Sequence, residues 1–344
     1  MEASALTRTM VESVVDRGIR EIAQDPRRSL RKLVDMGGLF AEGRFQKRFF
    51  ALLQAMLEDE TSPYYEMVRA TVAGVDPRHL KTFGMALGWE SWTVGARRIR
   101  AFERERGYNI PWSLTFRMGA GAMGPTDYRR VLAEAKAKGI CTYFFFLTGQ
   151  RGELDTVLEL AGGQSECAFL LFTPPALLEV PALRALARRD NAAVVVDADA
   201  PGWQAAVRRL REERRLYGLY RSYGDRAEGE ALASDRGVEE LLELAGPMLI
   251  CVARPGCPLQ TRERVRAWAE EARTGQRWGV VPVDFFAEVL MADRVISDGE
   301  RFLAADPDGG VWSWSWEGGE QPLPLNFRAQ GLTELLEEAE RLVK

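Results

Sequence analysis

The sequence predicts an α/β protein in which an all-helical region precedes a partial (β/α) TIM-like barrel, followed by a C-terminal β-hairpin and helix. Three changes of pattern support this prediction. Residues 1–106 repeat apolar side chains at helical spacing, residues 110–284 alternate short apolar runs with amphipathic segments, and the remaining residues change pattern again. We therefore expect three domains: a helical one (1–109), the barrel (110–284), and a hairpin with a helix packed on the barrel (285–344).

In the first region, apolar positions recur every three or four residues. Asp76 and Pro77 have the order of an N-cap and a first helical residue. The only histidine, His79, follows this helix start, so we expect a surface or capping role for it rather than a catalytic one. The expected helices include residues 4–23, 44–57, about 63–73, a helix beginning at 77, and 92–106.

The second region predicts parallel strands covered by helices, because each apolar run is short and most are followed by an amphipathic segment. Seven strand candidates in this order favour a partly closed barrel. After Asp284 the alternation weakens until the hairpin and the last helix. The expected strands are 112–116, 141–147, 167–172, 192–197, 216–220, 247–252 and 278–283, the hairpin pairs 302–305 with 311–316, and the last helix is 332–343.

Composition is that of an ordinary globular protein, with 46% hydrophobic and 28% charged residues and a net charge of −4. No apolar run is long enough to cross a membrane, and the first thirty residues lack the pattern of a secretory signal. We therefore expect a cytoplasmic protein with no nucleic-acid partner. The most basic stretch begins at Arg17 and ends at Arg48, with nine basic and four acidic residues. It is interpreted either as a surface for anionic lipid or an acidic partner, or as a solvated helix face.

Residues 80–116 (LKTFGMALGWESWTVGARRIRAFERERGYNIPWSLTF) resemble a group of bacterial radical S-adenosylmethionine (SAM) proteins. In that group a helical region ends in a similar stretch, and an NIPW segment leads into the first barrel strand. Weaker similarities follow at residues 143–149 (YFFFLTG), at 300–314, near the family's C-terminal hairpin, and at 331–339. The resemblance implies a radical SAM-type partial barrel.

The central motif of that family is absent. Radical SAM enzymes carry three cysteines, spaced C-x3-C-x2-C, after the first strand, where the thiolates hold a 4Fe–4S cluster. The equivalent residues here, 117–125 (RMGAGAMGP), contain no cysteine, histidine or carboxylate. The resemblance thus marks a degenerate cofactor loop at Gly119, Gly121, Gly124, Thr148 and Gly149. Neither a cluster nor bound SAM is expected.

The glycines of this loop also match the spacing of a dinucleotide-binding turn. That fingerprint requires an acidic residue about twenty positions further on, and none stands there. We therefore expect a tight structural linker, with an anion site at the following helix as the alternative.

Carboxylates follow several expected strands, at the edge where barrel enzymes place their active sites. Asp197, Asp199, Asp225, Asp284 and Glu153 could together form an acidic site at the barrel mouth, suited to a divalent cation. Helix capping is the alternative. The cysteines, Cys141, Cys167, Cys251 and Cys257, are interpreted as buried thiols, and no metal site is expected from them.

Trp312, Trp314 and Trp316 alternate along one strand, so their indoles share a face. We expect them to pack across the barrel mouth or against the helical domain, with a dimer contact as the alternative.

Three functions remain open. The first is a non-catalytic radical SAM-like pseudoenzyme that acts as a partner or regulatory subunit of an active, cysteine-bearing relative. The second is a protein that binds a small molecule or lipid at the barrel mouth, and the third is a repurposed enzyme with a divalent-metal acidic site. The expected partner is that paralogue or a second copy of the chain.

Overall fold

The computed structural model describes residues 2–22, 24–39, 44–297 and 299–343. Within them one sheet has the strand order β10-β9-β8-β1-β2-β3-β4-β5-β6-β7. Strands β1 to β7 are parallel neighbours in sequence order, β8 pairs parallel with β1, and β9 and β10 add an antiparallel edge. The expected partial (β/α) TIM-like barrel is therefore confirmed.

All seven expected parallel strands are present, and so is the hairpin. They are β1 (Ser113–Arg117), β2 (Thr142–Phe146), β3 (Ala168–Thr173), β4 (Ala192–Asp197), β5 (Tyr217–Tyr223), β6 (Met248–Ala253), β7 (Val281–Asp284), β8 (Leu303–Ala305) and β9 (Gly310–Ser315). Strand β10 (Gly319–Asn326) was not expected from the sequence. Its two prolines argue against a strand, and they are tolerated because β10 lies at the edge of the sheet.

The outer face of the sheet is covered by helices. Tyr128 of the first of them packs edge-on against Phe116 of β1, with ring centroids 5.6 Å apart. The covering elements are α7 (Pro125–Lys138), α8 (Glu153–Gly163), η2 (Pro175–Leu177), α9 (Val180–Leu186), α10 (Trp203–Glu212), α11 (Arg226–Leu232), α12 (Asp235–Leu242) and α13 (Leu259–Thr274). The C-terminal helix α15 (Leu332–Val343) packs against β10 and α7.

The first region is helical, as expected. Its elements are α1 (Glu2–Ile22), α2 (Pro26–Leu39), α3 (Arg44–Met56), α4 (Pro63–Gly74), α5 (Pro77–Gly84), η1 (Met85–Gly95) and α6 (Ala96–Arg106). Asp76 caps α5 by accepting hydrogen bonds from the Arg78 and His79 amides. The sequence analysis placed a separate helix at 92–106, whereas the π-helical segment η1 joins α5 to α6 without a break.

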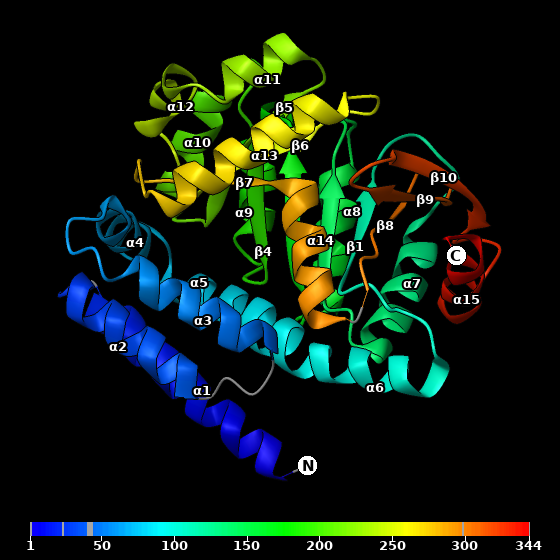
Figure 1. Ribbon diagram of the computed structural model, residues 1–344, viewed down its shortest axis with the longest axis horizontal. Coiled ribbons are helices and arrows are strands. Elements are labelled where there is room, and N and C mark those ends of the chain that lie inside the picture. The colour runs from blue at the N-terminus through cyan, green and yellow to red at the C-terminus, as the bar shows by residue number, and fades with distance from the viewer. Residues whose placement is uncertain (1, 23, 40–43, 298, 344) are drawn as a thin grey trace.

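This helical region lies at one end of the sheet (Figure 1). Phe83 and Ala86 pack against Ala168 and Ala193, which stand at the amino ends of β3 and β4. The carboxyl ends of the strands, where ligands bind in barrel proteins, are thus on the opposite edge. The expected domain boundaries at 109 and 284 remain predictions. None of the helices in the described ranges has the length and apolar character needed to cross a membrane.

Helix α14 (Phe285–Ile296), which the sequence analysis did not identify, runs across the inner face of the sheet (Figure 1). Phe285 contacts Phe144, Phe146 and Phe172 of β2 and β3, with ring centroids 5.1–5.3 Å apart. Because side chains alternate along a strand, these rings face away from α7. Trp112 anchors the helix, since its ring N–H donates to the Val289 carbonyl. The interior of the half-barrel is therefore filled by the chain's own aromatic side chains.

Candidate functional site

The loop between β1 and α7 is closed against the turn that follows β8. The Met123 amide donates to the Pro307 carbonyl oxygen at 2.9 Å, and the Ala122 amide donates to Asp308 Oδ1 at 3.0 Å. Gly121 lies so close that a Cβ there would be 2.4 Å from the Pro307 carbonyl carbon. Gly119 has a φ of +155°, which side chains rarely adopt. Both glycines thus serve the packing of this loop.

Gly124 precedes α7 as its N-cap, and its amide donates to Asp127 Oδ2 at 3.0 Å. A Cβ at Gly124 would have no neighbour within 4 Å among the residues that the structure describes. In a dinucleotide-binding turn the third glycine permits close helix packing. Nothing packs closely here, so the geometry favours the structural interpretation of the three glycines.

The backbone amides of the loop after β2 are bound by Glu153, the first residue of α8. Glu153 is buried, and its carboxylate accepts hydrogen bonds from the amides of Thr148, Gly149 and Gln150 at 2.9–3.3 Å. The Thr148 hydroxyl donates to the other carboxylate oxygen at 2.6 Å. These amides and this carboxylate satisfy one another, so the loop presents few free polar groups to a ligand.

The cluster that the family resemblance implies does not fit these residues. Residues 117–125 supply no thiolate, imidazole or carboxylate, and the loop is packed against Pro307. Four-iron clusters need side chains able to ligate iron. No step of the family's chemistry can therefore be assigned to this loop.

The carboxylates at the strand ends each have local partners. Asp197 accepts from the Asp199 amide, and burial raises the pKa of its carboxyl. Asp199 forms an ion pair with Arg221 at 2.7 Å and accepts from the Ser222 amide. Asp225 caps α11 through the Glu228 amide. Asp225 thus has the helix-capping role that was the alternative, whereas Asp199 binds residues of β5 and does not cap α10, whose N-cap is Gly202.

Asp284 is 2% exposed and caps α14 by accepting from the Ala287 amide. The Tyr223 hydroxyl donates to its second oxygen at 2.7 Å. Burial raises the pKa of Asp284 to about 6, although both hydrogen bonds act in the opposite direction. Across the described ranges, no three histidine, cysteine, aspartate or glutamate side chains come together in a way that could hold a metal ion. The structure thus does not bring the predicted acidic residues together as one site.

The tryptophans of β9 pack across the barrel, as expected. Trp314 stacks on Phe286 of α14 with ring centroids 4.4 Å apart. The Arg117 guanidinium lies 3.9 Å from the centre of the Trp312 ring and pairs with Glu320. These contacts close the mouth with side chains from β1, β9, β10 and α14.

His79 contradicts its expected surface or capping role, because its side chain is fully buried. The apolar surroundings come from the way α5 packs against the sheet, which helix patterning could not reveal. Burial, and to a smaller extent Arg215, lower the pKa of His79 to about 3. The expectation of buried thiols is confirmed for all four cysteines.

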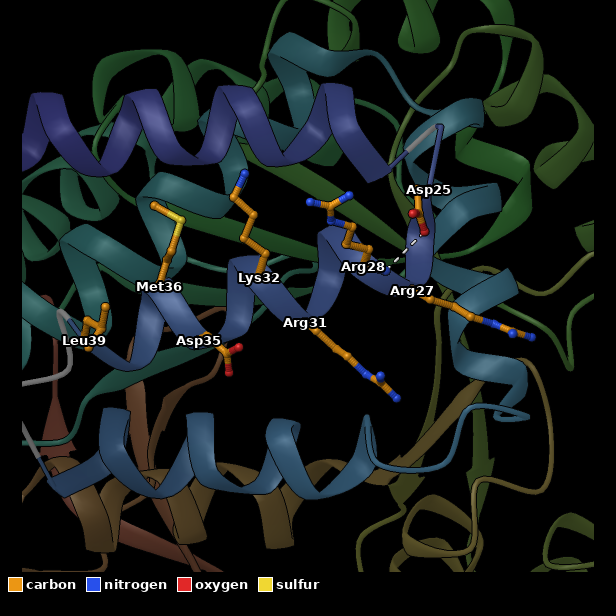
Figure 2. A pocket seen from close by; sticks show the side chains of 8 residues that line it. All are labelled: Asp25, Arg27, Arg28, Arg31, Lys32, Asp35, Met36 and Leu39. Atoms are coloured by element: carbon orange, nitrogen blue, oxygen red, sulfur yellow. Dashed lines mark hydrogen bonds between the residues drawn. The ribbon is translucent and has the colours of Figure 1, made fainter.

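The basic stretch lies on the end of α1, on α2 and on the start of α3, and its residues 23 and 40–43 lie outside the described residues. Figure 2 shows a hollow lined by side chains of α2 and the residue before it. It carries acidic Asp25 and Asp35 beside the basic residues. Arg17 and Lys32 both pair with Glu21. These ion pairs neutralise part of the positive charge, and lipid binding there remains a prediction.

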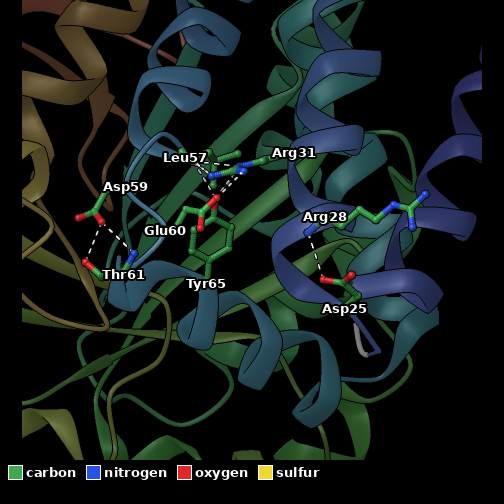
Figure 3. Close-up of polar contacts among 8 residues, drawn as sticks. All are labelled: Asp25, Arg28, Arg31, Leu57, Asp59, Glu60, Thr61 and Tyr65. Atoms are coloured by element: carbon green, nitrogen blue, oxygen red, sulfur yellow. Dashed lines mark hydrogen bonds and ion pairs between the residues drawn. The ribbon is translucent and has the colours of Figure 1, made fainter.

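Arg31 is also held within the protein (Figure 3). Its guanidinium donates to the Leu57 carbonyl at 2.9–3.1 Å and to the Tyr65 hydroxyl, and it pairs with Glu60. Arg31 therefore joins α2 to the turn before α4 instead of facing a ligand.

Sequence analysis missed Arg262, a 4% exposed residue in the first turn of α13. The signal available was the Arg254-Pro255-Gly256 turn after β6, which places α13 at the strand ends. An arginine on a helix gives no sign in sequence of whether it will be buried.

The chain is similar to known proteins in structure but not in sequence. No protein-family model matches the chain, and no curated protein is significantly similar to it. Two crystal structures of Streptococcus suis SuiB are similar in structure, one of them bound to S-adenosylmethionine. The first has 12% identity and a TM-score of 0.47 over 62% of this chain and 63% of that chain. The second has 11% identity and a TM-score of 0.48 over 70% of this chain and 67% of that chain. At these values neither likeness carries an argument about function.

Proposed function

We propose that this chain is a non-catalytic radical SAM-like protein that works as a partner or regulatory subunit of a cysteine-bearing relative. The observation that carries the proposal is the loop after β1, which lacks metal-ligating side chains and is packed on Pro307. The resemblance of residues 80–116 to radical SAM proteins supports a common origin of the scaffold.

Two further features support a retained shape over a retained reaction. Glu153 satisfies the amides of the loop after β2, where the family resemblance places the segment that contacts SAM. Helix α14 occupies the inner face of the sheet, where Phe285 meets three rings of β2 and β3. A substrate therefore has little room inside the half-barrel, while the outer surfaces stay available to a partner.

The first test is anaerobic reconstitution of the purified full chain with iron and sulfide. We expect no stoichiometric iron–sulfur absorbance in the visible range, and no heat of binding when SAM is titrated into the protein. A stoichiometric cluster would overturn the non-catalytic part of the proposal.

The second test concerns the partner. The tagged chain is co-expressed with a relative from the same genome that keeps the three cysteines, and the two are purified together. We expect a stable complex that elutes together on size exclusion and has higher activity than the relative alone. Separate elution combined with unchanged activity would refute the partner role.

A further inference from the structure

A small cavity lies at the carboxyl edge of the sheet, where barrel proteins bind their ligands. Its volume is about 20 Å³, enough for one water-sized group. The cavity lies between the turn after β6, the first turn of α13 and the β9–β10 hairpin. Its polar lining includes Arg254, Arg262 and Glu320.

Arg262 is a buried cation in this wall. Its terminal nitrogens donate to the Ser315 and Glu317 carbonyls, at 3.5 and 3.2 Å. The Trp314 ring centre lies 5.2 Å from the guanidinium carbon. Within the described part of the chain Arg262 forms no ion pair, and its buried Nε has no hydrogen-bond partner. A buried charge without a counter-charge is unfavourable, so this position favours an anion.

The cavity is lined by two other charged residues, Arg254 and Glu320. Arg254 stands at the rim with its side chain 50% exposed, paired on one side with Glu228. Glu320 also lines the cavity, but its carboxylate already accepts two hydrogen bonds from Arg117, at 2.9 and 2.6 Å. Gly319 has a φ of +68°, and a Cβ there would lie 3.7 Å from an Arg262 nitrogen.

We propose that this cavity binds one carboxylate group of a small organic acid. The guanidinium groups of Arg254 and Arg262 donate hydrogen bonds to the carboxylate, and the rest of the ligand stays at the rim. The cavity has room for one carboxylate oxygen, and the second oxygen lies at the rim beside Arg254. A phosphate would place three oxygens at the rim, beside the carboxylates of Glu228 and Glu320. The site is independent of the partner role, because its two arginines come from the turn after β6 and from α13 rather than from the loop after β1.

The probe is succinate, and its binding to the full chain is measured by saturation-transfer NMR, with inorganic phosphate as competitor. We expect saturable succinate binding that phosphate does not displace. R262Q and R254Q should each weaken it at least tenfold. R266Q is the matched control, because Arg266 is exposed on the same helix, lies 4.9 Å from the Trp316 ring and does not line the cavity.

Failure of succinate to saturate, or equal loss in R266Q, would overturn the site. Displacement by phosphate at equal concentration would overturn the assignment to a carboxylate. If R262Q does not fold, R254Q decides the question, since Arg254 is exposed at the rim and its substitution leaves the core unchanged.

Discussion

The contact between Gly121 and Pro307 leaves no space for a side chain, although Gly121 itself is exposed to solvent. The obstacle is backbone, so it cannot rotate away as a side chain would. The Met123 and Ala122 amides hold the two loops together on either side of the contact. Adding one Cβ atom at position 121 would therefore be enough to push the two loops apart.

We predict that Gly121→Ala lowers the free energy of unfolding by about 1–3 kcal/mol, because overpacking forces the loop away from Pro307. Urea denaturation measures the loss. Ala120→Ser, an exposed neighbour in the same loop, should change stability by no more than about 0.5 kcal/mol. Equal stability of G121A and wild type would show that the loop is not closed on the hairpin.

His79 predicts a dependence of stability on pH. Its pKa of about 3 in the folded protein lies below the 6.5 of the unfolded chain. Between these values only the unfolded state binds the proton, so stability falls as the pH falls, by up to about 1.4 kcal/mol per pH unit. Asp284, with its pKa raised to about 6, acts in the opposite direction between about pH 4 and 6. The effect of His79 is therefore measured as the difference in unfolding free energy between wild type and a variant that lacks this histidine.

The comparison is between wild type and His79→Leu, with urea denaturation at several pH values from 7.5 to 4.5. We expect H79L to gain stability relative to wild type steadily as the pH falls below 6.5. Neither ring nitrogen of His79 has a hydrogen-bond partner within the described residues, so the substitution breaks no such bond. If the difference in stability between the two proteins does not change with pH, His79 takes up a proton as readily in the folded protein as in the unfolded chain.

At the scale of elements, α14 determines what the barrel can hold. In most β–α repeats the helix covers the outer face, whereas α14 lies on the inner one and meets the rings of β2 and β3. Trp112, which ends the family-like NIPW segment, donates its backbone amide to Asp293 and its ring N–H to the Val289 carbonyl. The lead-in to β1 and the inner helix are therefore one unit.

Phe285→Ala should lower the free energy of unfolding by about 3–5 kcal/mol, because it leaves a cavity among the rings of β2 and β3. Met291→Ala on the same helix is the control, since Met291 is 38% exposed and should cost less than about 1 kcal/mol. The two variants are compared by urea denaturation. If both variants lose less than about 1 kcal/mol of unfolding free energy, α14 does not pack in the core of the half-barrel.

The continuous helix from α5 to α6 offers a second matched pair. A Cβ at Gly95 would lie 2.3 Å from the Gly139 carbonyl oxygen, where η1 meets the turn between α7 and β2. A Cβ at Gly84 would meet none of the described residues within 4 Å. We predict that Gly95→Ala destabilises by about 1–3 kcal/mol and that Gly84→Ala is neutral or stabilising by up to about 1 kcal/mol. Thermal unfolding followed by circular dichroism distinguishes them, and a stable G95A would contradict the close approach.

At the scale of the whole molecule, the helices before β1 are tied to the barrel at several points. The Asp76 amide donates to the Arg214 carbonyl at 2.8 Å, and the Tyr64 hydroxyl donates to the Arg273 carbonyl. Thr142 of β2 donates its hydroxyl hydrogen to the Ser91 hydroxyl at 2.9 Å. These bonds cross the boundary expected at residue 109.

We therefore predict that the helical region and the barrel unfold in one cooperative transition. Gly95→Ala in the helical region and Phe285→Ala in the barrel should lower the same transition temperature in calorimetry. Two transitions, each moved by only one variant, would instead support independent domains divided at 109.

The sequence by itself determined the strands β1 to β7, the hairpin, most helices, and the absence of metal-ligating residues in the loop after β1. Local periodicity and residue chemistry are enough for these features. Only the tertiary structure placed α14 inside the barrel, buried His79 and Arg262, and joined Glu153 to the amides of Thr148 and Gly149. Periodicity reports which residues are apolar, but both faces of a parallel sheet are apolar, so it cannot report which face a helix covers. The two prolines of β10 concealed this edge strand in the sequence. The partners of the strand-end carboxylates are decided by packing, which the sequence does not report.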